Sequence, residues 1–325
     1  MSHAIRFDQT GGPDVLQWVP LEVPPPGPGE VSLTHTAVGL NYIDTYHRSG
    51  LYPVPMPSGL GCEAAGVITA VGDGVDGFSV GDRVAYAGGP LGAYAEARTL
   101  PASVLVRLPD AISDEVAAAV MLQGLTAQYL LRQTYPVEAG ETILVHAAAG
   151  GVGLLMCQWA KHLGVTVIGT VGSPEKAALA KANGCDYTIL YRQDSFLDAV
   201  KDITGGEGVP VVYDAVGKDT FMDSLACLQP MGTMVSFGNA SGAVPPIDIG
   251  ILAKMGSLFL TRPTLFSYIA DRERLDAMAA DLFNVISKGA VKVQINQRYP
   301  LADAAQAHRD LEARNTTGST VLVVS

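Results

Sequence analysis

The chain has few cysteines and no basic run. Its four cysteines, Cys62, Cys157, Cys185 and Cys227, are far apart and form no C-x-x-C pair, which argues against a zinc knuckle or a disulfide framework and is typical of reduced thiols. The formal charge of -11 comes without a cluster of lysines and arginines, so binding to nucleic acid is disfavoured.

Long hydrophobic segments are also missing. The first residues, M-S-H-A-I-R-F, lack the apolar core of a signal peptide, and the longest apolar stretch is broken by His146 and a glycine turn, so no membrane span is expected. Together with the isolated cysteines, this predicts a soluble cytoplasmic protein without a nucleic-acid or membrane partner.

What the chain does contain is enough apolar sequence for sizeable cores. At 325 residues and 48% hydrophobic content, about two domains are expected. Six apolar runs alternate with helical patterns, which predicts a doubly wound parallel sheet. The expected strands are 142–146, 165–171, 186–190, 209–214, 232–237 and 257–261, with helices after Gly151, Pro174, Asp194, Asp219 and Asp248.

The two ends of the chain have a different pattern. The first 120 residues show short alternating runs with proline-rich breaks, typical of a mostly β domain. After Pro263 we expect a helix through Lys288, a strand near 291–299, a helix at 301–313 and a last strand, 319–324, which could rejoin the first domain.

A small-residue turn joins the first expected strand of the sheet to its helix. Against the dinucleotide fingerprint G-x-G-x-x-G, the turn supplies Ala148, Gly150 and Gly153, with alanine in the first glycine slot. Gly150 would let the backbone approach a pyrophosphate, and Gly153 would let the helix lie close to the strand. Plain packing between a strand and a helix is the alternative explanation.

The end of the second expected strand indicates which dinucleotide fits. An NAD site carries an acid roughly 20 residues beyond the turn, whereas here Val171 is followed by Gly172, Ser173, Pro174, Glu175 and Lys176. A hydroxyl and an ammonium suit a 2′-phosphate, which favours NADP(H). Ser173 could also simply cap a helix, and Glu175 is expected to point away from the turn.

Five motifs make the chain similar to the quinone oxidoreductases of the medium-chain dehydrogenase/reductase superfamily, the branch that includes zeta-crystallin. They are G-G-P-D-V-L at 11–16, G-L-N-Y-I-D-T-Y-H-R-S-G-L-Y at 39–52, P-S-G-L-G-C-E-A-A-G at 57–66, A-A-A-G-G-V-G-L-L-M-C-Q-W-A-K at 147–161 and V-V-Y-D-A-V-G at 211–217.

The resemblance implies an α/β fold in which a Rossmann doubly wound parallel sheet is inserted into a GroES-like, mostly β catalytic domain. The expected boundaries are 1–124 and 263–325 for the catalytic domain and 125–262 for the NADP(H)-binding domain. It also implies NADPH as the cofactor, a small-molecule quinone as the substrate and a homodimer joined through the Rossmann sheets.

The same superfamily includes zinc-dependent alcohol dehydrogenases, and this chain departs from their ligand pattern. By motif, the ligand cysteine is replaced by Asn41, and the ligand histidine of G-H-E by Cys62 in G-C-E. Cys62 and Glu63 alone do not complete the usual three protein ligands. We therefore expect no metal, and hydride transfer then requires an acceptor that is already electron-poor, such as a quinone.

The family's site residues carry over by motif. Asn41, Tyr46 and Tyr52 are the expected catalytic residues, since each can donate a hydrogen bond to a reduced oxygen. The alternative role is ordinary amphipathic packing for the two tyrosines, and a turn or a buried backbone contact for Asn41. The expected cofactor contacts are Asn41, Tyr46, Thr126, Gly150, Gly151, Val152, Gly153, Gly172, Ser173, Lys176, Tyr191, Phe237, Gly238, Asn239 and Arg314.

Two other functions stay open at this point. An NADPH-dependent reductase of alkenals or enones would use the same hydride geometry with an acid for the α-carbon. An NADPH-binding structural or RNA-binding protein, as the zeta-crystallin relatives suggest, is the other. The acidic charge balance disfavours RNA, and the number of electrons transferred per step is not settled by sequence.

Overall fold

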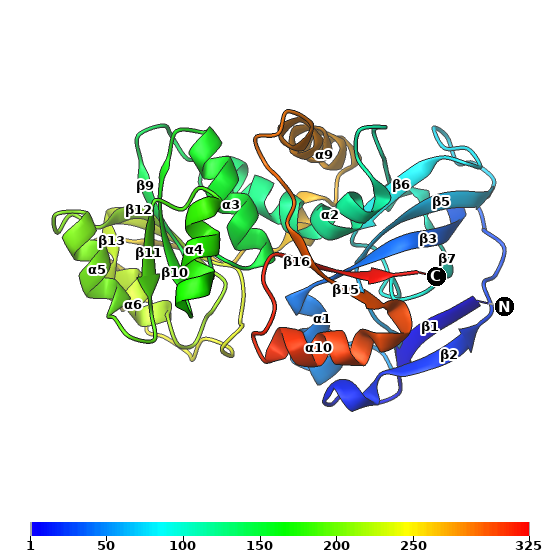
Figure 1. Cartoon of the computed structure of the whole chain (residues 1–325), viewed down its shortest axis with the longest axis horizontal. Coiled ribbons are helices and arrows are strands. Elements are labelled where there is room, and N and C mark those ends of the chain that lie inside the picture. The colour runs from blue at the N-terminus through cyan, green and yellow to red at the C-terminus, as the bar shows by residue number, and fades with distance from the viewer. Residues whose placement is uncertain (1, 325) are drawn as a thin grey trace. The chain divides into compact units, whose positions relative to one another are not determined.

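The computed structural model describes residues 2–324, which form two compact units. The first unit comprises Met1–Leu125, Ile269–Ser287 and Val293–Ser325, and the second comprises Thr126–Tyr268 and Lys288–Lys292. Both termini therefore belong to the first unit (Figure 1).

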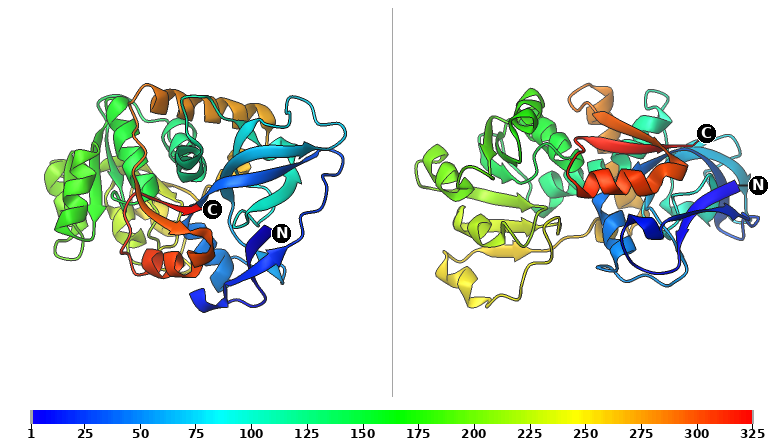
Figure 2. Two further views of the ribbon diagram at one scale, coloured as in Figure 1. Left: turned by 45° about the vertical axis from the view of Figure 1, so that its right-hand side comes forward. Right: turned by 60° about the horizontal axis from the view of Figure 1, so that its bottom comes forward.

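The first unit is built on antiparallel strands from both chain ends. Its larger sheet has the order β15-β16-β3-β5-β6-β8, with β7 also paired to β3, and a small sheet has the order β2-β1-β4. Strand β16 pairs antiparallel with β3, Val321 lying opposite Gly39. The expectation that the last strand rejoins the first domain is confirmed, and Figure 2 shows this carboxyl-terminal segment in red beside the amino-terminal strands in blue.

The elements of the first unit have the following bounds. Its strands are β1 Ser2–Phe7, β2 Gln17–Leu21, β3 Glu30–Leu40, β4 Ser58–Gly59, β5 Glu63–Val71, β6 Arg83–Ala87, β7 Ala97–Pro101, β8 Val106–Arg107, β15 Ile295–Pro300 and β16 Ser319–Val323. Its helices are α1 Tyr42–Ser49, α9 Arg272–Ser287 and α10 Ala304–Glu312, with short 3-10 turns at Pro13–Val15, Ala102–Val104 and Leu301–Asp303. Helix α2, Asp114–Tyr129, continues from this unit into the next.

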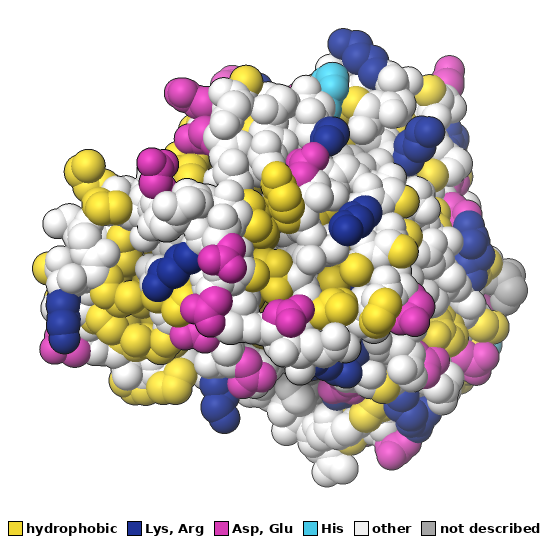
Figure 3. All heavy atoms as spheres, turned by 60° about the vertical axis from the view of Figure 1, so that its left-hand side comes forward, with side chains coloured by type: hydrophobic (Ala, Val, Ile, Leu, Met, Phe, Trp, Pro, Cys, Tyr) yellow, Lys and Arg dark blue, Asp and Glu magenta, His cyan; other side chains and the backbone are white. Residues whose placement is uncertain are grey.

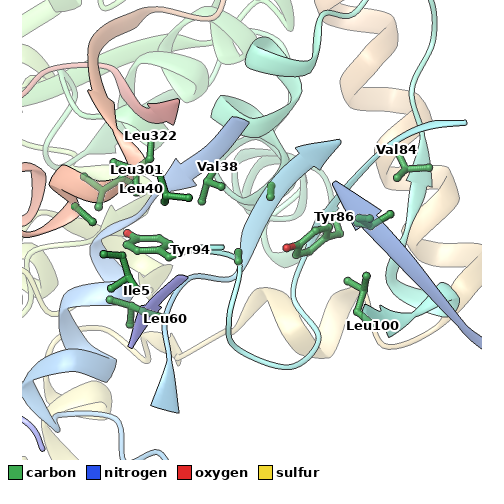
Figure 4. Close-up of a cluster of buried hydrophobic side chains, with 14 of the residues drawn as sticks. Ile5, Val38, Leu40, Leu60, Val84, Tyr86, Tyr94, Leu100, Leu301 and Leu322 are labelled. Atoms are coloured by element: carbon green, nitrogen blue, oxygen red, sulfur yellow. The ribbon is translucent and has the colours of Figure 1, made fainter. Parts of the chain in front are cut away.

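The core of the first unit gathers side chains from strands and loops at both ends of the chain. Figure 4 shows Leu40 and Leu322 from paired strands beside Leu301 and Tyr94, with Val84, Tyr86 and Leu100 further along the sheet. Segments distant in sequence thus share one hydrophobic cluster, and burial of apolar surface holds the two chain ends together.

The second unit is a parallel sheet with the order β11-β10-β9-β12-β13-β14. In sequence order this is 3-2-1-4-5-6, the arrangement of a dinucleotide-binding Rossmann fold. Helices α3 and α4 cover one face and α5 and α6 the other (Figure 1). The predicted α/β class and the parallel sheet are confirmed.

The elements of the second unit follow the predicted alternation. Its strands are β9 Thr142–Val145, β10 Thr166–Val171, β11 Tyr187–Leu190, β12 Val209–Asp214, β13 Leu228–Ser236 and β14 Phe259–Thr261. Its helices are α3 Gly151–His162, α4 Pro174–Ala182, α5 Phe196–Ile203, α6 Phe221–Ala226, α7 Gly250–Lys254 and α8 Leu265–Tyr268, and a π-helical turn, Leu130–Thr134, follows α2.

Several details go beyond or differ from the sequence expectation, and two of them are the following. The mostly β first domain contains helix α1, whose start is fixed by Asn41 and whose end is Gly50 in the left-handed region, φ 86°. Strand β13 begins four residues before the expected 232, at Leu228. Of residues 2–324, no helix is long and apolar enough to cross a membrane.

Candidate functional site

In the second unit, the turn between β9 and α3 presents backbone N–H groups at the amino end of a helix. Ala147 lies in the left-handed region, φ 54°, and Gly150 N donates to its carbonyl at 2.9 Å. The first helical hydrogen bond runs from Leu154 N to the Gly150 carbonyl, 2.9 Å. The N–H groups of Gly151, Val152 and Gly153 precede it, so the helix start can bind an anion.

The two glycines of the fingerprint have different structural needs. A Cβ on Gly153 would lie 2.3 Å from the Ala147 carbonyl oxygen and 2.8 Å from Ala148 Cα, so only glycine lets α3 lie this close to the turn. The predicted packing role of Gly153 is therefore confirmed. A Cβ on Gly150 would meet the Ala147 oxygen at 3.3 Å, a tight contact but a less severe one than those at Gly153.

At the end of β10 a second polar group of residues gathers around Gly172. A Cβ on Gly172 would lie 3.3 Å from Tyr191 Oη and 3.7 Å from Arg192 Nε, so both side chains reach the turn that Ser173 begins. Ser173 caps α4 by accepting from Lys176 N at 3.3 Å. The structure thus brings Gly172, Ser173, the backbone N–H of Lys176 and the Tyr191 side chain together, and it adds Arg192, which the sequence pattern did not single out.

The expectation that Glu175 points away from this turn is wrong. The Ser173 side chain hydrogen-bonds to the Glu175 carboxylate, and this bond is the main cause that lowers the pKa of Glu175. Glu175 is exposed, however, and a charge pair in water interacts by only about 1 kcal/mol at 4 Å. The carboxylate weakens, without cancelling, the attraction of Lys176 and Arg192 for an anion.

The turn after β13 rests on the turn after β12. Phe237 N donates to the Asp214 carbonyl at 2.8 Å, and Ala240 N donates to the Ala215 carbonyl at 3.1 Å. A Cβ on Gly238 would lie 2.4 Å from the Ala215 oxygen. The predicted contact residues Phe237, Gly238 and Asn239 therefore form one tightly packed loop, and Thr126 is buried where this unit begins.

His146 lies beside the phosphate turn but does not have the environment of a catalytic base. Its Nδ1 and Nε2 lie 2.9 Å from the hydroxyls of Thr170 and Ser224, and burial lowers the pKa of the imidazole. Both nitrogens have partners, as in a satisfied core histidine.

In the first unit, Asn41 precedes α1 and makes three hydrogen bonds to other side chains. Its N donates to Asp44 Oδ2 at 2.9 Å, its Nδ2 donates to Glu63 Oε2 at 2.6 Å, and its Oδ1 accepts from Gln123 Nε2 at 3.1 Å. Nδ2 carries two hydrogens and Glu63 accepts one of them. The amide orientation is fixed by protein groups, which suits a residue that positions another molecule.

The three aromatic residues of this segment pack on one another. The Tyr46 ring lies edge-on to Tyr42 and Tyr52, with centroids at 5.5 and 5.1 Å. Tyr46 is buried, and Tyr52 N donates to the Tyr46 carbonyl at 3.1 Å. Arg314, exposed with φ 62°, is close enough to Tyr42 to oppose the rise that burial causes in its pKa.

Two buried carboxyl groups support Asn41. Burial raises the pKa of Glu63 to about 8, against hydrogen bonds from Asn41 and Leu122 N that favour its ionised form. Burial likewise raises the pKa of Asp44 to about 7. Because the Asn41 amide and the Glu63 carboxyl bind each other, Asn41 offers no thiolate or free carboxylate in the slot where the alcohol dehydrogenases have a ligand cysteine.

One group of side chains was not predicted from the sequence. Asp44, His47 and Cys62, all buried, place one ligand atom each within 4.8 Å of the others. The available signal was the spacing of three between Asp44 and His47, which puts both on one face of a helix. Cys62 joins them only through the tertiary structure.

Two family models match separate parts of the chain. Residues 27–110 match the family described as alcohol dehydrogenase GroES-like domain, and residues 151–284 match the zinc-binding dehydrogenase family. A quinone oxidoreductase of Pseudomonas aeruginosa is 58% identical, over 99% of this chain and 100% of that protein.

Two solved structures are similar over nearly the whole chain. A quinone oxidoreductase of Pseudomonas syringae superposes with a TM-score of 0.98 at 56% identity, covering 99% of this chain and 100% of the other. A quinone oxidoreductase of Escherichia coli, in complex with NADPH, superposes with a TM-score of 0.97 at 51% identity, covering 99% of each chain.

The buried hydrogen bonds of His308 predict that the free energy of unfolding depends on pH. His308 Nδ1 accepts from Arg48 at 3.1 Å, its Nε2 lies 3.1 Å from Tyr94 Oη, and burial, together with Arg48, lowers the pKa of His308 from 6.5 to about 3. A depressed folded-state pKa contributes stability that is present above pH 6.5 and lost as the pH falls. The loss is about 1.4 kcal/mol per pH unit.

Urea unfolding of the native chain and of His308→Gln, between about pH 7 and pH 4.5, measures this contribution. Glutamine keeps an acceptor for Arg48 but cannot be protonated in this range. We expect the native chain to lose on the order of 2 kcal/mol more than the variant across the interval; parallel curves would contradict the assignment.

Proposed function

The chain belongs to the quinone oxidoreductases of the medium-chain dehydrogenase/reductase superfamily, and on this basis we propose that it is an NADPH:quinone oxidoreductase acting on soluble quinones. The observation that supports the cofactor choice is the group around Gly172, where the side chains of Ser173, Tyr191 and Arg192 gather at the end of β10 and Lys176 lies in the first turn of the helix that follows.

The second unit has the donors that a phosphorylated dinucleotide needs. The N–H groups at Gly151–Gly153 suit the pyrophosphate, and Gly150 leaves room for it. Lys176 and Arg192 suit a 2′-phosphate, since charge-assisted hydrogen bonds to phosphate are about twice as strong as neutral ones. Thr126, the Phe237–Asn239 loop and Arg314 remain proposed contacts.

The residues proposed to bind the quinone, which accepts the hydride, are Asn41, Tyr46 and Tyr52. NADPH supplies a hydride, and a quinone that receives it together with a proton becomes a hydroquinone. Asn41 donates a hydrogen bond from a fixed amide, and the tyrosine hydroxyls can donate to a quinone oxygen as it gains charge. The acceptor is already electron-poor, so positioning and hydrogen bonds provide the catalysis.

A steady-state assay tests the activity directly. The chain is given NADPH or NADH with 1,4-benzoquinone, 9,10-phenanthrenequinone or 2-cyclohexenone, and loss of the reduced nicotinamide is followed. We expect quinone turnover with NADPH and little or none with the enone. Enone turnover without quinone turnover would favour the alkene reductase instead, and binding of NADPH without any turnover would favour a structural or RNA-binding protein.

Lys176→Ala and Arg192→Ala are expected to impair NADPH selectively. Loss of one charge-assisted bond of about 1.4 kcal/mol corresponds to a roughly tenfold higher KM for NADPH, with the KM for NADH unchanged. Lys181→Ala is the matched control, because Lys181 is an exposed lysine near the end of the same helix. Equal effects on both coenzymes would refute the phosphate assignment.

We also propose that two copies associate through strand β14. Among the described residues β14 pairs only with β13, so its other edge offers unpaired backbone groups. Phe259 and Leu260 on it are 61% and 37% exposed, and Met231 on β13 is 69% exposed. Figure 3 shows one face on which hydrophobic side chains gather between charged ones. Such an edge is typical of an interface.

Phe259→Asp is expected to convert the dimer to a monomer in light scattering after size-exclusion chromatography, because it places a charge at the centre of the proposed contact. Val80→Asp is the control: Val80 is 65% exposed and lies in the first unit. A dimer that survives Phe259→Asp, or one broken equally by both changes, would exclude this interface.

A cytoplasmic location is proposed from the cysteines. All four are free thiols and buried, as is usual in reducing compartments. Recovery of the native protein from a periplasmic or secreted fraction would contradict it.

A further inference from the structure

Helix α1 and the turn before β5 bring together three side chains to which the proposed reaction assigns no role. Asp44, His47 and Cys62 are 0%, 8% and 1% exposed, and one ligand atom of each lies within 4.8 Å of the other two. A carboxylate, an imidazole and a thiol in one buried group are ligand types that bind transition metals.

Two atoms of this group lack hydrogen-bond partners. Within residues 2–324, Asp44 Oδ1 and His47 Nδ1 are the buried side-chain nitrogen and oxygen atoms without a partner. The other oxygen of Asp44 accepts from Asn41 N and from Tyr94 Oη, both at 2.9 Å. Buried polar atoms in native proteins are nearly always satisfied, so two unpartnered atoms on residues of one group point to an occupant.

The backbone holds the three residues in place. Asp44 and His47 are three residues apart on α1 and share one face of the helix. The Cys62 carbonyl accepts from Gly88 N at 2.7 Å, and the Gly61 carbonyl accepts from Gly92 N and Ala93 N at 3.1 and 3.2 Å. The thiol is therefore presented by a turn that is anchored on both sides.

We propose that Asp44, His47 and Cys62 form a binding site for one zinc-type divalent cation. The thiolate and imidazole select Zn²⁺ or Co²⁺ over Mg²⁺ and Ca²⁺, which prefer all-oxygen ligands. On binding, the Cys62 S–H bond breaks, its proton goes to solvent and a metal–sulfur bond forms, without any redox change. Three protein ligands leave the fourth position for water.

The spacing is compatible with this ion. In a tetrahedral site with bonds of roughly 2.0 to 2.3 Å, ligand atoms stand about 3.6 Å apart. The widest pair, at most 4.8 Å apart here, would close by about 1 Å, within reach of side-chain rotation about fixed backbones. Of the three ligands only Cys62 stands in a motif position of the alcohol dehydrogenase zinc, whereas Asp44 and His47 lie outside that motif. The proposal does not rest on the proposed function.

Cobalt reports the ligands directly. Chain without a histidine tag is stripped with chelator, titrated with Co²⁺, desalted and analysed for metal. We expect about one bound cobalt per chain and the absorption bands of a thiolate-ligated tetrahedral ion, displaced by Zn²⁺. If a water molecule rather than a metal ion occupies the group, no cobalt will remain after desalting. That result would overturn the proposal.

Variants assign the ligands. Cys62→Ser should abolish the thiolate band, and both Cys62→Ser and His47→Gln should weaken cobalt binding by about a hundredfold or more. Cys227→Ser is the control, because Cys227 is a buried cysteine elsewhere in the chain, and it should bind like the native protein. Near-ultraviolet circular dichroism in chelator checks that each variant is folded.

Two further outcomes would reject the site: a cobalt spectrum without a thiolate band, or native affinity in both the Cys62 and His47 variants. A rise of a few degrees in the thermal midpoint on adding Zn²⁺, absent in Cys62→Ser, is the expected independent readout. None of these measurements uses NADPH or quinone, so failure of the metal site and failure of the proposed reaction are distinguished.

Discussion

The buried carboxyl group of Glu63 is the point on which the first unit's site depends. It accepts from Asn41 Nδ2 and from Leu122 N, both at 2.6 Å, and so joins the start of α1 to β5 and α2. Gly39 has no side chain because a Cβ there would lie 2.2 Å from Glu63 Oε2. Burying an acid costs free energy unless the acid is hydrogen-bonded. Glu63 therefore depends on its donors Asn41 and Leu122 and on the space that Gly39 leaves.

Asp214 has the corresponding part in the second unit. Its Oδ1 accepts from Val216 N at 2.7 Å and Gly217 N at 3.0 Å, and its Oδ2 accepts from Thr220 Oγ1 at 2.7 Å. Ser224 links the same oxygen to His146. The loop after β12 is fixed in this way, and the Phe237–Asn239 loop then rests on it. In each unit a buried acid, Glu63 or Asp214, fixes by hydrogen bonds the segments beside which the proposed contact residues lie.

Local pattern was enough to predict the parallel sheet. Strand β12 was expected at 209–214 and is Val209–Asp214, and Thr142–Val145 falls inside the expected 142–146, because buried parallel strands form continuous apolar runs bounded by turn residues. Gly153 was assigned to close packing for a reason that the structure confirms. These features depend on residues near one another in the sequence.

The parts that escaped prediction depend on residues that the fold brings together. Arg192 reaches the Ser173 turn from the next strand along, and Glu175 turns toward Ser173 although a helix position alone suggested otherwise. Cys62 meets Asp44 only through the pairing of β5 with its neighbours. A motif comparison places Cys62 in a ligand slot, but it cannot show that Asp44 and His47 lie next to Cys62 in the folded chain.

The two proposals for the segment from Asn41 to Glu63 are compatible because they use different atoms. Asn41 and Glu63 bind each other and orient an amide, whereas Asp44, His47 and Cys62 form a separate group of ligand atoms. Asp44 is the shared member: its Oδ2 fixes the Asn41 backbone, and its Oδ1 belongs to the metal group. An ion there would neutralise a buried carboxylate and steady the residue that positions the acceptor, without becoming a Lewis acid for it.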